Sequence, residues 1–239
     1  MKKPIFFIIY QWLIALPVLL IITPLVAIAT MILSPILPNS SVSYFPACWW
    51  GRIICHLLFI KVKLINVDKL DTRQSSIIIA NHQSAFDVFA IYGWYPGVFK
   101  WIMKAELRRI PLVGKACEAA GHVFIDRSNP IAAIKSLKRA EQQLMDGVSV
   151  VIFPEGTRTR DGKMGMFKRG AFRLAADLSL PVVPVTIRGS FERMPRKALY
   201  VKPGTIEMIF HNPIGIAPYL PDNIHQFIQV CRDEIEKDL

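Results

Sequence analysis

The chain has 239 residues, of which 52% are hydrophobic, and its 29 basic against 18 acidic side chains give a formal net charge of +11. This length allows one sizeable α/β domain and a short appendage. The positive charge is typical of proteins that meet anionic lipid, phosphorylated substrates or nucleic acid. We expect no nucleic-acid partner, because nothing in the sequence resembles a recognition helix, a zinc knuckle or an RNA-binding aromatic motif.

The apolar residues gather at the N-terminal end. Residues 5–37 contain no charged side chain, and Arg52 is the only Lys, Arg, Asp or Glu between positions 4 and 60. The run is long enough to cross a bilayer, which needs about 20 apolar residues. It is too long for a cleaved signal peptide, whose apolar core is usually about 7–15 residues. We expect three prolines to bend or break its helix, namely Pro17, Pro24 and Pro35.

A second helical segment follows a turn at residues 38–41. Its apolar residues recur at helical spacing from position 45 to 58, and Arg52 lies on the opposite side. Such a helix lies along a membrane interface more readily than through it. Burial of Trp49 and Trp50 in the protein core is an equally good interpretation.

From residue 61 onward, short runs rich in Ile, Val or Phe alternate with helical patterns. We predict strands at 61–67, 75–80, 98–103, 122–126, 148–153, 182–188 and 204–210. We predict helices at 84–94, 112–120, 130–146, 167–179 and 221–237. The alternation predicts an α/β fold with a mixed, largely parallel sheet covered by helices. We divide the chain into a membrane-anchoring helical segment at 1–60 and an α/β domain at 61–239.

The cysteines and most histidines predict no bound metal. The four cysteines show no C-x-x-C spacing, so we interpret them as reduced core or membrane residues. His122, His211 and His225 form no metal-like spacing with a carboxylate, and we interpret each as structural.

Two polar clusters directly follow predicted strands, where ligands bind in sheets of this kind. They are NHQSAFD at 81–87 and FPEGTR at 153–158. His82 and Asp87 are five residues apart, so they do not share one stripe of a straight helix. A histidine in the turn before a helix can instead fold back toward an aspartate in its first turn. The carboxylate would hold one imidazole nitrogen and leave the other free as a base, although an isolated HxxxxD is also compatible with a plain helix cap.

Four blocks of the sequence resemble the signature blocks of the glycerolipid acyltransferases, and in particular of the 1-acylglycerol-3-phosphate acyltransferase family. NHQSAFD at 81–87 is similar to the family's NHxSxxD, and GHVFIDR at 121–127 resembles its GxxFIDR. FPEGTR at 153–158 is the family's most recognisable string, and VPVTIRG at 183–189 resembles its Val/Pro-rich strand. The four blocks occur in order and span most of the chain between about residues 60 and 190.

The resemblance implies transfer of a fatty acyl group to the sn-2 hydroxyl of lysophosphatidic acid, which gives phosphatidic acid. The donor would be acyl-CoA or acyl-carrier protein, with no further cofactor, and His82 would be the general base oriented by Asp87. A hydrolase is disfavoured because no serine lies in a G-x-S-x-G elbow, and we interpret Ser84 as a capping hydroxyl. The alternatives are acylation of glycerol-3-phosphate or another lysophospholipid, and a non-catalytic, basic membrane-binding protein.

The resemblance also implies where the acceptor phosphate binds. Arg158 offers a planar fork suited to phosphate, and Gly156 lets the backbone approach closely. Thr157 belongs to the same block, and we expect Glu155 to position either Arg158 or the glycerol.

Four further basic residues are weaker candidates. Lys104 and Arg127 each follow a predicted strand and are candidate substrate-binding residues. Lys168 and Arg169 open a predicted helix and face either the carrier of the donor or solvent.

The charges predict how the first 60 residues meet the membrane. Lys2, Lys3 and Arg52 are the only charged residues there, so the remainder carries 26 basic and 18 acidic side chains, or +8. Lys2 and Lys3 favour a cytoplasmic N-terminus, and the donor would be cytosolic, so a single crossing is excluded. Arg52 would cost about 2.5–3.5 kcal/mol at a bilayer centre. We therefore favour a bent helical hairpin in one leaflet over two full crossings, with the catalytic domain facing the cytoplasm at a bacterial inner membrane.

Overall fold

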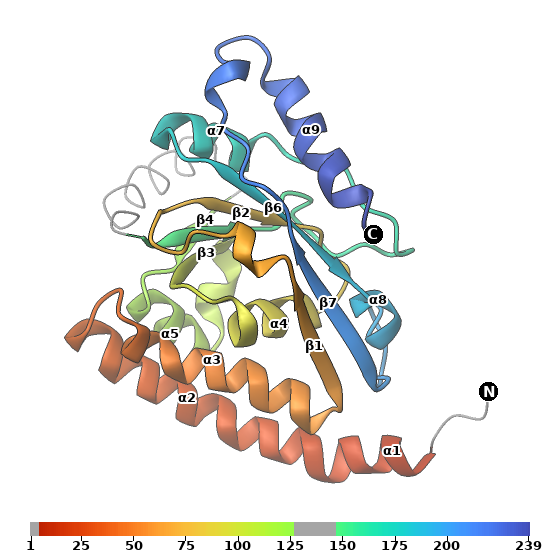
Figure 1. Cartoon of the computed structure of the whole chain (residues 1–239). Helices are drawn as coiled ribbons and strands as arrows, with labels where there is room; N and C mark the ends of the chain where they lie inside the picture. Colours follow the sequence, from red (N-terminus) through yellow and green to blue (C-terminus); the bar gives the residue numbers. More distant parts are fainter. Residues whose placement is uncertain (1–4, 127–146) are drawn as a thin grey trace.

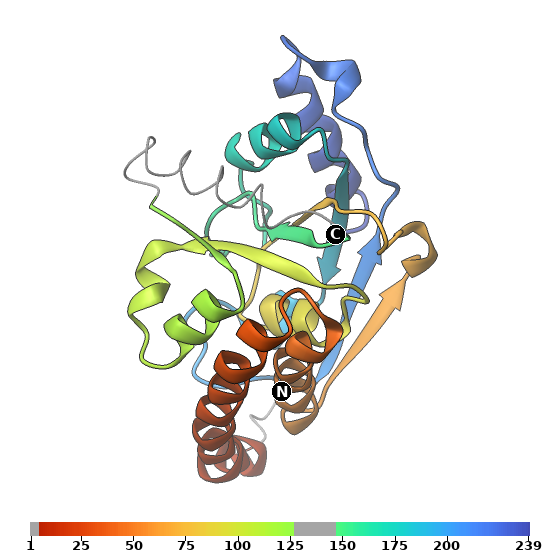
Figure 2. The same cartoon turned by 90° about the vertical axis from the view of Figure 1, so that its left-hand side faces the viewer.

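The computed structural model describes residues 5–126 and 147–239, and its core is a single sheet (Figures 1 and 2). Within the described residues the strands are β1 (Ile60–Ile65), β2 (Ile77–Ala80), β3 (Phe99–Lys104), β4 (Val123–Ile125), β5 (Ser149–Ile152), β6 (Val182–Arg188) and β7 (Gly204–Phe210). They lie side by side in the order β1-β7-β6-β2-β5-β3-β4. Every neighbouring pair is parallel except β6 and β7. The predicted α/β fold with a mixed, largely parallel sheet is confirmed.

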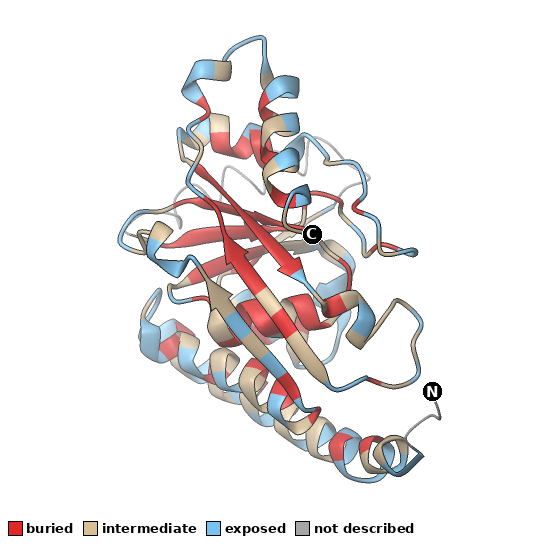
Figure 3. Ribbon diagram, turned by 45° about the vertical axis from the view of Figure 1, so that its right-hand side comes forward, coloured by how far each residue is buried: buried red, intermediate tan, exposed pale blue. Residues whose placement is uncertain are grey.

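Helices cover both faces of this sheet. On one face lies α4 (Phe86–Trp94), with α3 (Ser41–Leu57) packed against it, and α7 (Gly170–Leu178) and α9 (Ile224–Glu236) cover the other (Figure 1). Shorter helices are α1 (Ile5–Tyr10), α5 (Val113–Ala119) and α8 (Ser190–Arg193), with 3-10 turns at Val67–Lys69, Ala105–Arg109 and Ala217–Tyr219. The central strands are almost entirely buried between these layers (Figure 3).

The predicted elements agree closely with the observed ones. All seven predicted strands are present with ends within two residues, and β6 and β7 have the predicted bounds. Four of the predicted helices are present and are shorter by up to three residues at either end. The predicted helix at 130–146 lies outside the described residues.

The N-terminal apolar run forms one uninterrupted helix. It comprises α1, a π-helical turn (Gln11–Ala15) and α2 (Leu16–Ile36), and together they span Ile5–Ile36. In the described residues it is the one helix long and apolar enough to cross a membrane. Of the two predicted effects of the prolines, a bend or a break, the break does not occur. Each proline removes one backbone hydrogen bond, but the neighbouring turns keep theirs, and the wider π turn directly before Pro17 accommodates its ring.

The chain reverses at residues 37–40, close to the turn predicted at 38–41, so that α2 and α3 run side by side as a helical hairpin (Figure 1). The Trp50 indole donates to the Thr23 hydroxyl across the pair at 3.0 Å. Trp50 also packs edge-to-face on Phe89 of α4, whereas Trp49 is 46% exposed. The core interpretation therefore holds for Trp50, and Trp49 remains free to meet lipid.

The hairpin and the α/β domain share one hydrophobic core. Ile54 and Cys55 of α3 are buried together with residues of α4 and the sheet. A Cβ at Gly51 would lie 2.6 Å from the Phe89 carbonyl oxygen, so only glycine permits this close approach of α3 to α4. The division of the chain at residue 60 stays a prediction, because the two parts pack as one body.

Candidate active site

The two polar clusters meet because their strands are neighbours. β2 pairs with β5 in parallel, and Ile79 is opposite Ile152 in the register. Both strands therefore end at the same edge of the sheet, and the segments 81–87 and 153–158 leave it side by side. This is the edge at which ligands bind in α/β sheets.

His82 and Asp87 are in direct contact. Nδ1 of His82 lies 2.8 Å from Oδ2 of Asp87, which is in the first turn of α4. Because the carboxylate accepts the Nδ1 proton, the remaining ring nitrogen, Nε2, carries the free lone pair. Nε2 has no hydrogen-bond partner among the described residues, and the side chain is 15% exposed. The fold-back that we expected from the spacing is the observed geometry.

The Asp87 carboxylate is held in place by backbone donors as well. Its Oδ2 also accepts from the backbone N–H groups of Gln83 and Ser84, at 2.7 and 2.8 Å. Asp87 is fully buried, and these donors offset the cost of burying its charge. The Ser84 hydroxyl donates to the Met194 carbonyl oxygen at 2.9 Å and accepts from the Phe86 N–H, so it is tied to the backbone rather than poised as a nucleophile.

Aromatic packing fixes the plane of the His82 ring. The ring stacks on Phe153 with a centroid distance of 3.9 Å and an interplanar angle of 7°. Phe153 in turn stacks on Trp101 of β3 at 5.3 Å. With the Asp87 bond, this stack leaves the imidazole one orientation, which is the property a general base requires.

Glu155 holds two segments of the site together. One oxygen accepts from the His82 backbone N–H and the other from the Gly165 N–H, each at 2.7 Å. Burial raises the pKa of this carboxyl, and the two N–H bonds lower it. We expected Glu155 to position Arg158 or the glycerol. Its two oxygens instead fix the backbone of His82 and of the loop at 159–165.

Asn81 is a site residue that the sequence did not reveal. Its side chain is fully buried and makes a pair of hydrogen bonds to the Ile187 backbone in β6: Nδ2 donates to the carbonyl oxygen at 2.8 Å, and Oδ1 accepts from the N–H at 2.7 Å. The residue before His82 is thereby fixed to the neighbouring strand. The only signal in the sequence was the position of Asn81 at the head of the NHQSAFD block.

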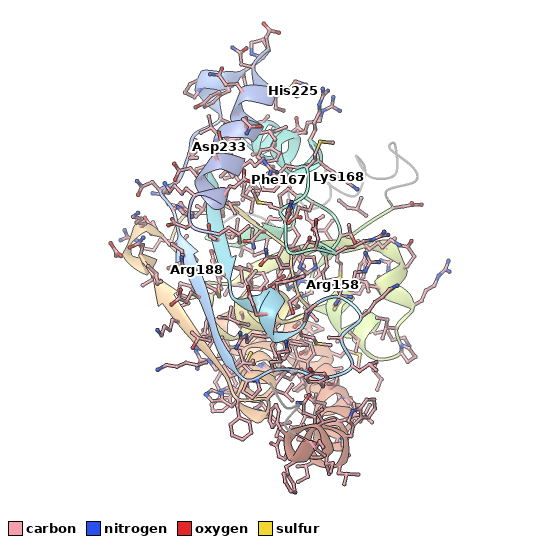
Figure 4. The ribbon with its side chains drawn as sticks, turned by 90° about the vertical axis from the view of Figure 1, so that its right-hand side faces the viewer. Arg158, Phe167, Lys168, Arg188, His225 and Asp233 are labelled. Atoms are coloured by element: carbon pink, nitrogen blue, oxygen red, sulfur yellow. The ribbon has the colours of Figure 1, made fainter. Side chains whose placement is uncertain are left out.

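The FPEGTR segment places Arg158 on the same cavity as His82. Gly156 has a φ of +75°, a conformation that a side chain would strain. Thr157 is exposed and Arg158 is half-buried. Arg158 has no ion pair within the described parts of the chain, so its guanidinium is available to an anion. Figure 4 shows it on the face formed by the loops that leave the sheet.

The other predicted basic residues are less well placed. Lys104, at the end of β3, lines the same cavity as His82, but it is engaged in an exposed ion pair with Glu106 at 2.7 Å. Arg127 lies outside the described residues. Arg169 contacts the His225 ring of α9, and Lys168 lies beside Phe167, away from Arg158 in the view of Figure 4.

A cavity of about 500 Å³ opens beside His82. Its wall is mainly apolar and is built from the hairpin, α4, β3 and α5. Representative lining residues are Ala27, Trp50, Phe99, Met103 and Ala116. His82, Gly156, Thr157 and Arg158 also line it, so the candidate base and the free guanidinium border the same apolar space.

Two buried titratable groups lie in the cavity wall. Lys100 donates to the Ala120 carbonyl oxygen at 2.6 Å, and burial lowers its pKa to about 8. His122 bonds the Tyr92 hydroxyl and accepts from the Trp101 N–H, and burial lowers its pKa to about 3. His122 is thus a neutral, fully bonded core residue.

The remaining cysteines and histidine have ordinary surroundings. All four cysteines are free, and burial raises the pKa of Cys55 and Cys231 to about 12. His211 is buried against the Thr186 hydroxyl at 2.8 Å. Within residues 5–126 and 147–239, no three His, Cys, Asp or Glu side chains gather as metal ligands.

Comparison with known proteins agrees with this geometry. The chain is 35% identical over 176 residues to the chloroplastic 1-acyl-sn-glycerol-3-phosphate acyltransferase of Arabidopsis thaliana, a match covering 72% of this chain and 48% of that protein. It is 34% identical over 190 residues to the 1-acyl-sn-glycerol-3-phosphate acyltransferase of Limnanthes douglasii, covering 79% of this chain and 67% of that one. The Pseudomonas aeruginosa protein of the same name is 32% identical, over 68% and 62% of the two chains. The match therefore spans about half the length of the Arabidopsis relative.

A solved structure shares the fold. The 1-acyl-sn-glycerophosphate acyltransferase of Thermotoga maritima superposes with a TM-score of 0.76 at 23% identity, covering 98% of this chain and 95% of that one. A family model described as Acyltransferase matches residues 61–188, which is more than half of the chain and includes both polar clusters. The chain belongs to this acyltransferase family.

Proposed function

We propose that the protein transfers an acyl group from a thioester to the sn-2 hydroxyl of lysophosphatidic acid, which gives phosphatidic acid. The observation that carries this proposal is the contact between His82 and Asp87 at the edge of an apolar cavity. Its volume of about 500 Å³ lies within the range of about 300–1,000 Å³ typical of ligand pockets. The relatives are named for the same class of reaction.

In the proposed reaction, Nε2 of His82 removes the proton from the sn-2 hydroxyl as its oxygen attacks the thioester carbonyl carbon. The tetrahedral intermediate collapses with cleavage of the carbon–sulfur bond, and the proton on His82 passes to the departing thiolate. Asp87 stabilises the imidazolium that forms in between and keeps its orientation. A general base of this kind typically contributes about 10²–10⁴-fold.

The two substrates are expected to bind to different parts of the site, the charged group of the acceptor to Arg158 and the acyl chain of the donor to the apolar cavity. Arg158 can hold the acceptor phosphate through a bidentate contact, which also brings the sn-2 hydroxyl close to the base. The acyl chain of the thioester fits the apolar cavity. The donor is acyl-CoA or acyl-carrier protein, both of which present the same type of thioester.

The N-terminal hairpin supports a membrane location. The outer face of its long helix exposes large apolar side chains, among them Phe6, Leu13, Leu20 and Ile21. Burial of such a surface in lipid would bring the cavity, whose wall the hairpin helps to form, to the membrane. We propose that the hairpin enters one leaflet and that the α/β domain faces the cytoplasm.

A panel of acceptors tests the proposed function. The purified protein is given one acyl-CoA and, in turn, lysophosphatidic acid, glycerol-3-phosphate, lysophosphatidylcholine and water. We expect acylated product with lysophosphatidic acid at a kcat/KM well above that with the other acceptors. Preferred acylation of glycerol-3-phosphate would reassign the acceptor, and a protein that binds vesicles without forming product from any acceptor would refute the proposed enzyme.

A further inference from the structure

A second pocket lies against the FPEGTR segment and differs from the apolar cavity in its chemistry. It has a volume of about 450 Å³ and is lined by the loop at 155–166 and by Arg196, which follows α8. Four basic side chains line it, namely Arg158, Arg160, Lys163 and Arg196. Thr157 and Arg158 line both pockets, so the two spaces meet at these residues.

The acidic residues of this pocket offset only part of its positive charge, because Glu155 and Asp161 stand against four basic side chains. Both carboxylate oxygens of Glu155 accept hydrogen bonds from backbone N–H groups, and neither forms an ion pair with a basic side chain of the pocket. One oxygen of Asp161 accepts from the Thr159 hydroxyl and the Lys163 backbone N–H. Within the described residues, none of the four basic side chains forms an ion pair. The pocket therefore keeps a net positive charge, which attracts an anion.

The two pockets differ in their relation to the membrane hairpin. Residues of α2 and α3 line the apolar cavity, whereas no residue of the hairpin lines the basic pocket. Under the proposed function the acceptor is a lipid, so it reaches His82 from the side of the hairpin. The basic pocket, which has no hairpin residue in its lining, is then open to the water-soluble part of the donor.

We infer that this basic pocket binds the phosphate of the acyl donor's phosphopantetheine carrier. The inference rests on the proposed function. With the acyl chain in the apolar cavity and the thioester at His82, the carrier must leave through the junction at Thr157 and Arg158. The pantetheine arm separates the sulfur from its phosphate, and this length lets the phosphate reach Arg160, Lys163 and Arg196.

The acceptor phosphate is a poorer occupant of this pocket. In lysophosphatidic acid only one carbon and one oxygen separate the sn-2 carbon from the phosphorus. Its phosphate must therefore stay close to His82, where Arg158 meets it. The three outer basic residues are then left for a second anion, and the carrier supplies one.

Ligand binding tests the inference without requiring turnover. The affinities of full-length protein in detergent are measured for CoA, 4′-phosphopantetheine, pantetheine and lysophosphatidic acid. They are compared with those of a Lys163→Ala/Arg196→Ala variant. The matched control is Lys115→Ala, which removes an exposed charge from α5, outside both pockets. We expect the double variant to bind CoA roughly three- to thirtyfold more weakly, as for two partly exposed charge contacts.

The four ligands separate the outcomes. Weakened binding of phosphopantetheine as well as CoA assigns the pocket to the phosphate that CoA and carrier protein share. Weakened binding of CoA without weakened binding of phosphopantetheine would overturn the inference and assign the pocket to the additional phosphates of CoA. Unchanged CoA affinity, an equal loss for pantetheine, or a loss confined to lysophosphatidic acid would overturn the inference. The proposed function fails separately, if wild-type protein that binds CoA forms no acylated product.

Discussion

Replacement of Glu155 by glutamine distinguishes a residue that fixes the His82 backbone from one that binds substrate. Both carboxylate oxygens accept backbone N–H bonds at 2.7 Å, from His82 and Gly165. The glutamine amide keeps one acceptor and turns its NH₂ group toward the other N–H, which is then buried without a partner. Such a loss costs about 1–3 kcal/mol. For a chain of this size the midpoint of thermal unfolding should fall by roughly 2–12 °C.

The same variant should also slow the reaction. Release of the His82 backbone loosens the imidazole, so we expect kcat to fall while the KM for the acceptor stays within about twofold of wild type. Glu118→Gln is the matched control, because that residue forms an exposed ion pair with Arg108, worth about 0–1 kcal/mol. Thermal unfolding and steady-state kinetics are measured on all three proteins. An unchanged unfolding midpoint with a raised acceptor KM would refute the backbone role and return Glu155 to the glycerol.

Three other perturbations test separate parts of the structure. Arg158→Lys keeps the charge but loses the planar fork, so the acceptor KM should rise while the donor KM does not; the reverse in steady-state kinetics would move the phosphate site elsewhere. Burial lowers the pKa of Lys100 from 10.5 to about 8. Between these values the unfolded chain holds the Lys100 proton and the folded chain does not, so the contribution of Lys100 to stability should rise with pH by about 3 kcal/mol. The buried Cys55 and Cys231, whose pKa values are raised, contribute in the opposite direction in both proteins. The difference in unfolding free energy between wild type and Lys100→Met in denaturant titrations should therefore show the rise, and a difference independent of pH would contradict the assignment. The hairpin is tested with a single cysteine at position Asn39, after the native cysteines have been replaced by alanine. An impermeant thiol reagent added to the non-cytoplasmic side of sealed vesicles should not label this cysteine. Labelling there would establish two full crossings.

The sequence predicted the parts of the site that depend on local chain geometry. The contact between His82 and Asp87 needs only a turn followed by the first turn of a helix, which the spacing of five residues allows and the resemblance of the whole block favoured. The approach of the segments 81–87 and 153–158 needs only two neighbouring parallel strands that end at one edge. Both contacts follow once the strands and helices are placed correctly along the sequence, and all seven strands were.

The parts of the site that the sequence did not predict depend on contacts between distant segments. Asn81 bonds Ile187, which is 106 residues away, and Glu155 bonds the loop at 159–165 only after that loop has folded over the strand ends. The apolar cavity needs the hairpin at one end of the chain and β3 with α5 in the middle. No periodicity in any single segment carries such information.

The prolines misled the sequence interpretation for a related reason. A proline costs one hydrogen bond in an isolated helix, but α2 continues through Pro24 and is bound to α3 by the Thr23–Trp50 bond. The hairpin and the turn near residues 38–41 were predicted, but the sequence did not show that the first helix continues through its prolines as far as that turn. Packing against a neighbouring helix outweighed the local preference.

The central claim is that His82, oriented by Asp87, is the general base of acyl transfer. The most direct test is turnover of lysophosphatidic acid and an acyl thioester by His82→Ala, with His56→Ala as a control because His56 is exposed on α3 and lines neither pocket. The unfolding midpoint of each variant establishes that it is folded. We predict that His82→Ala loses at least about 10²–10⁴-fold in kcat while His56→Ala retains activity. A folded His82→Ala protein with near-normal turnover would contradict the mechanism.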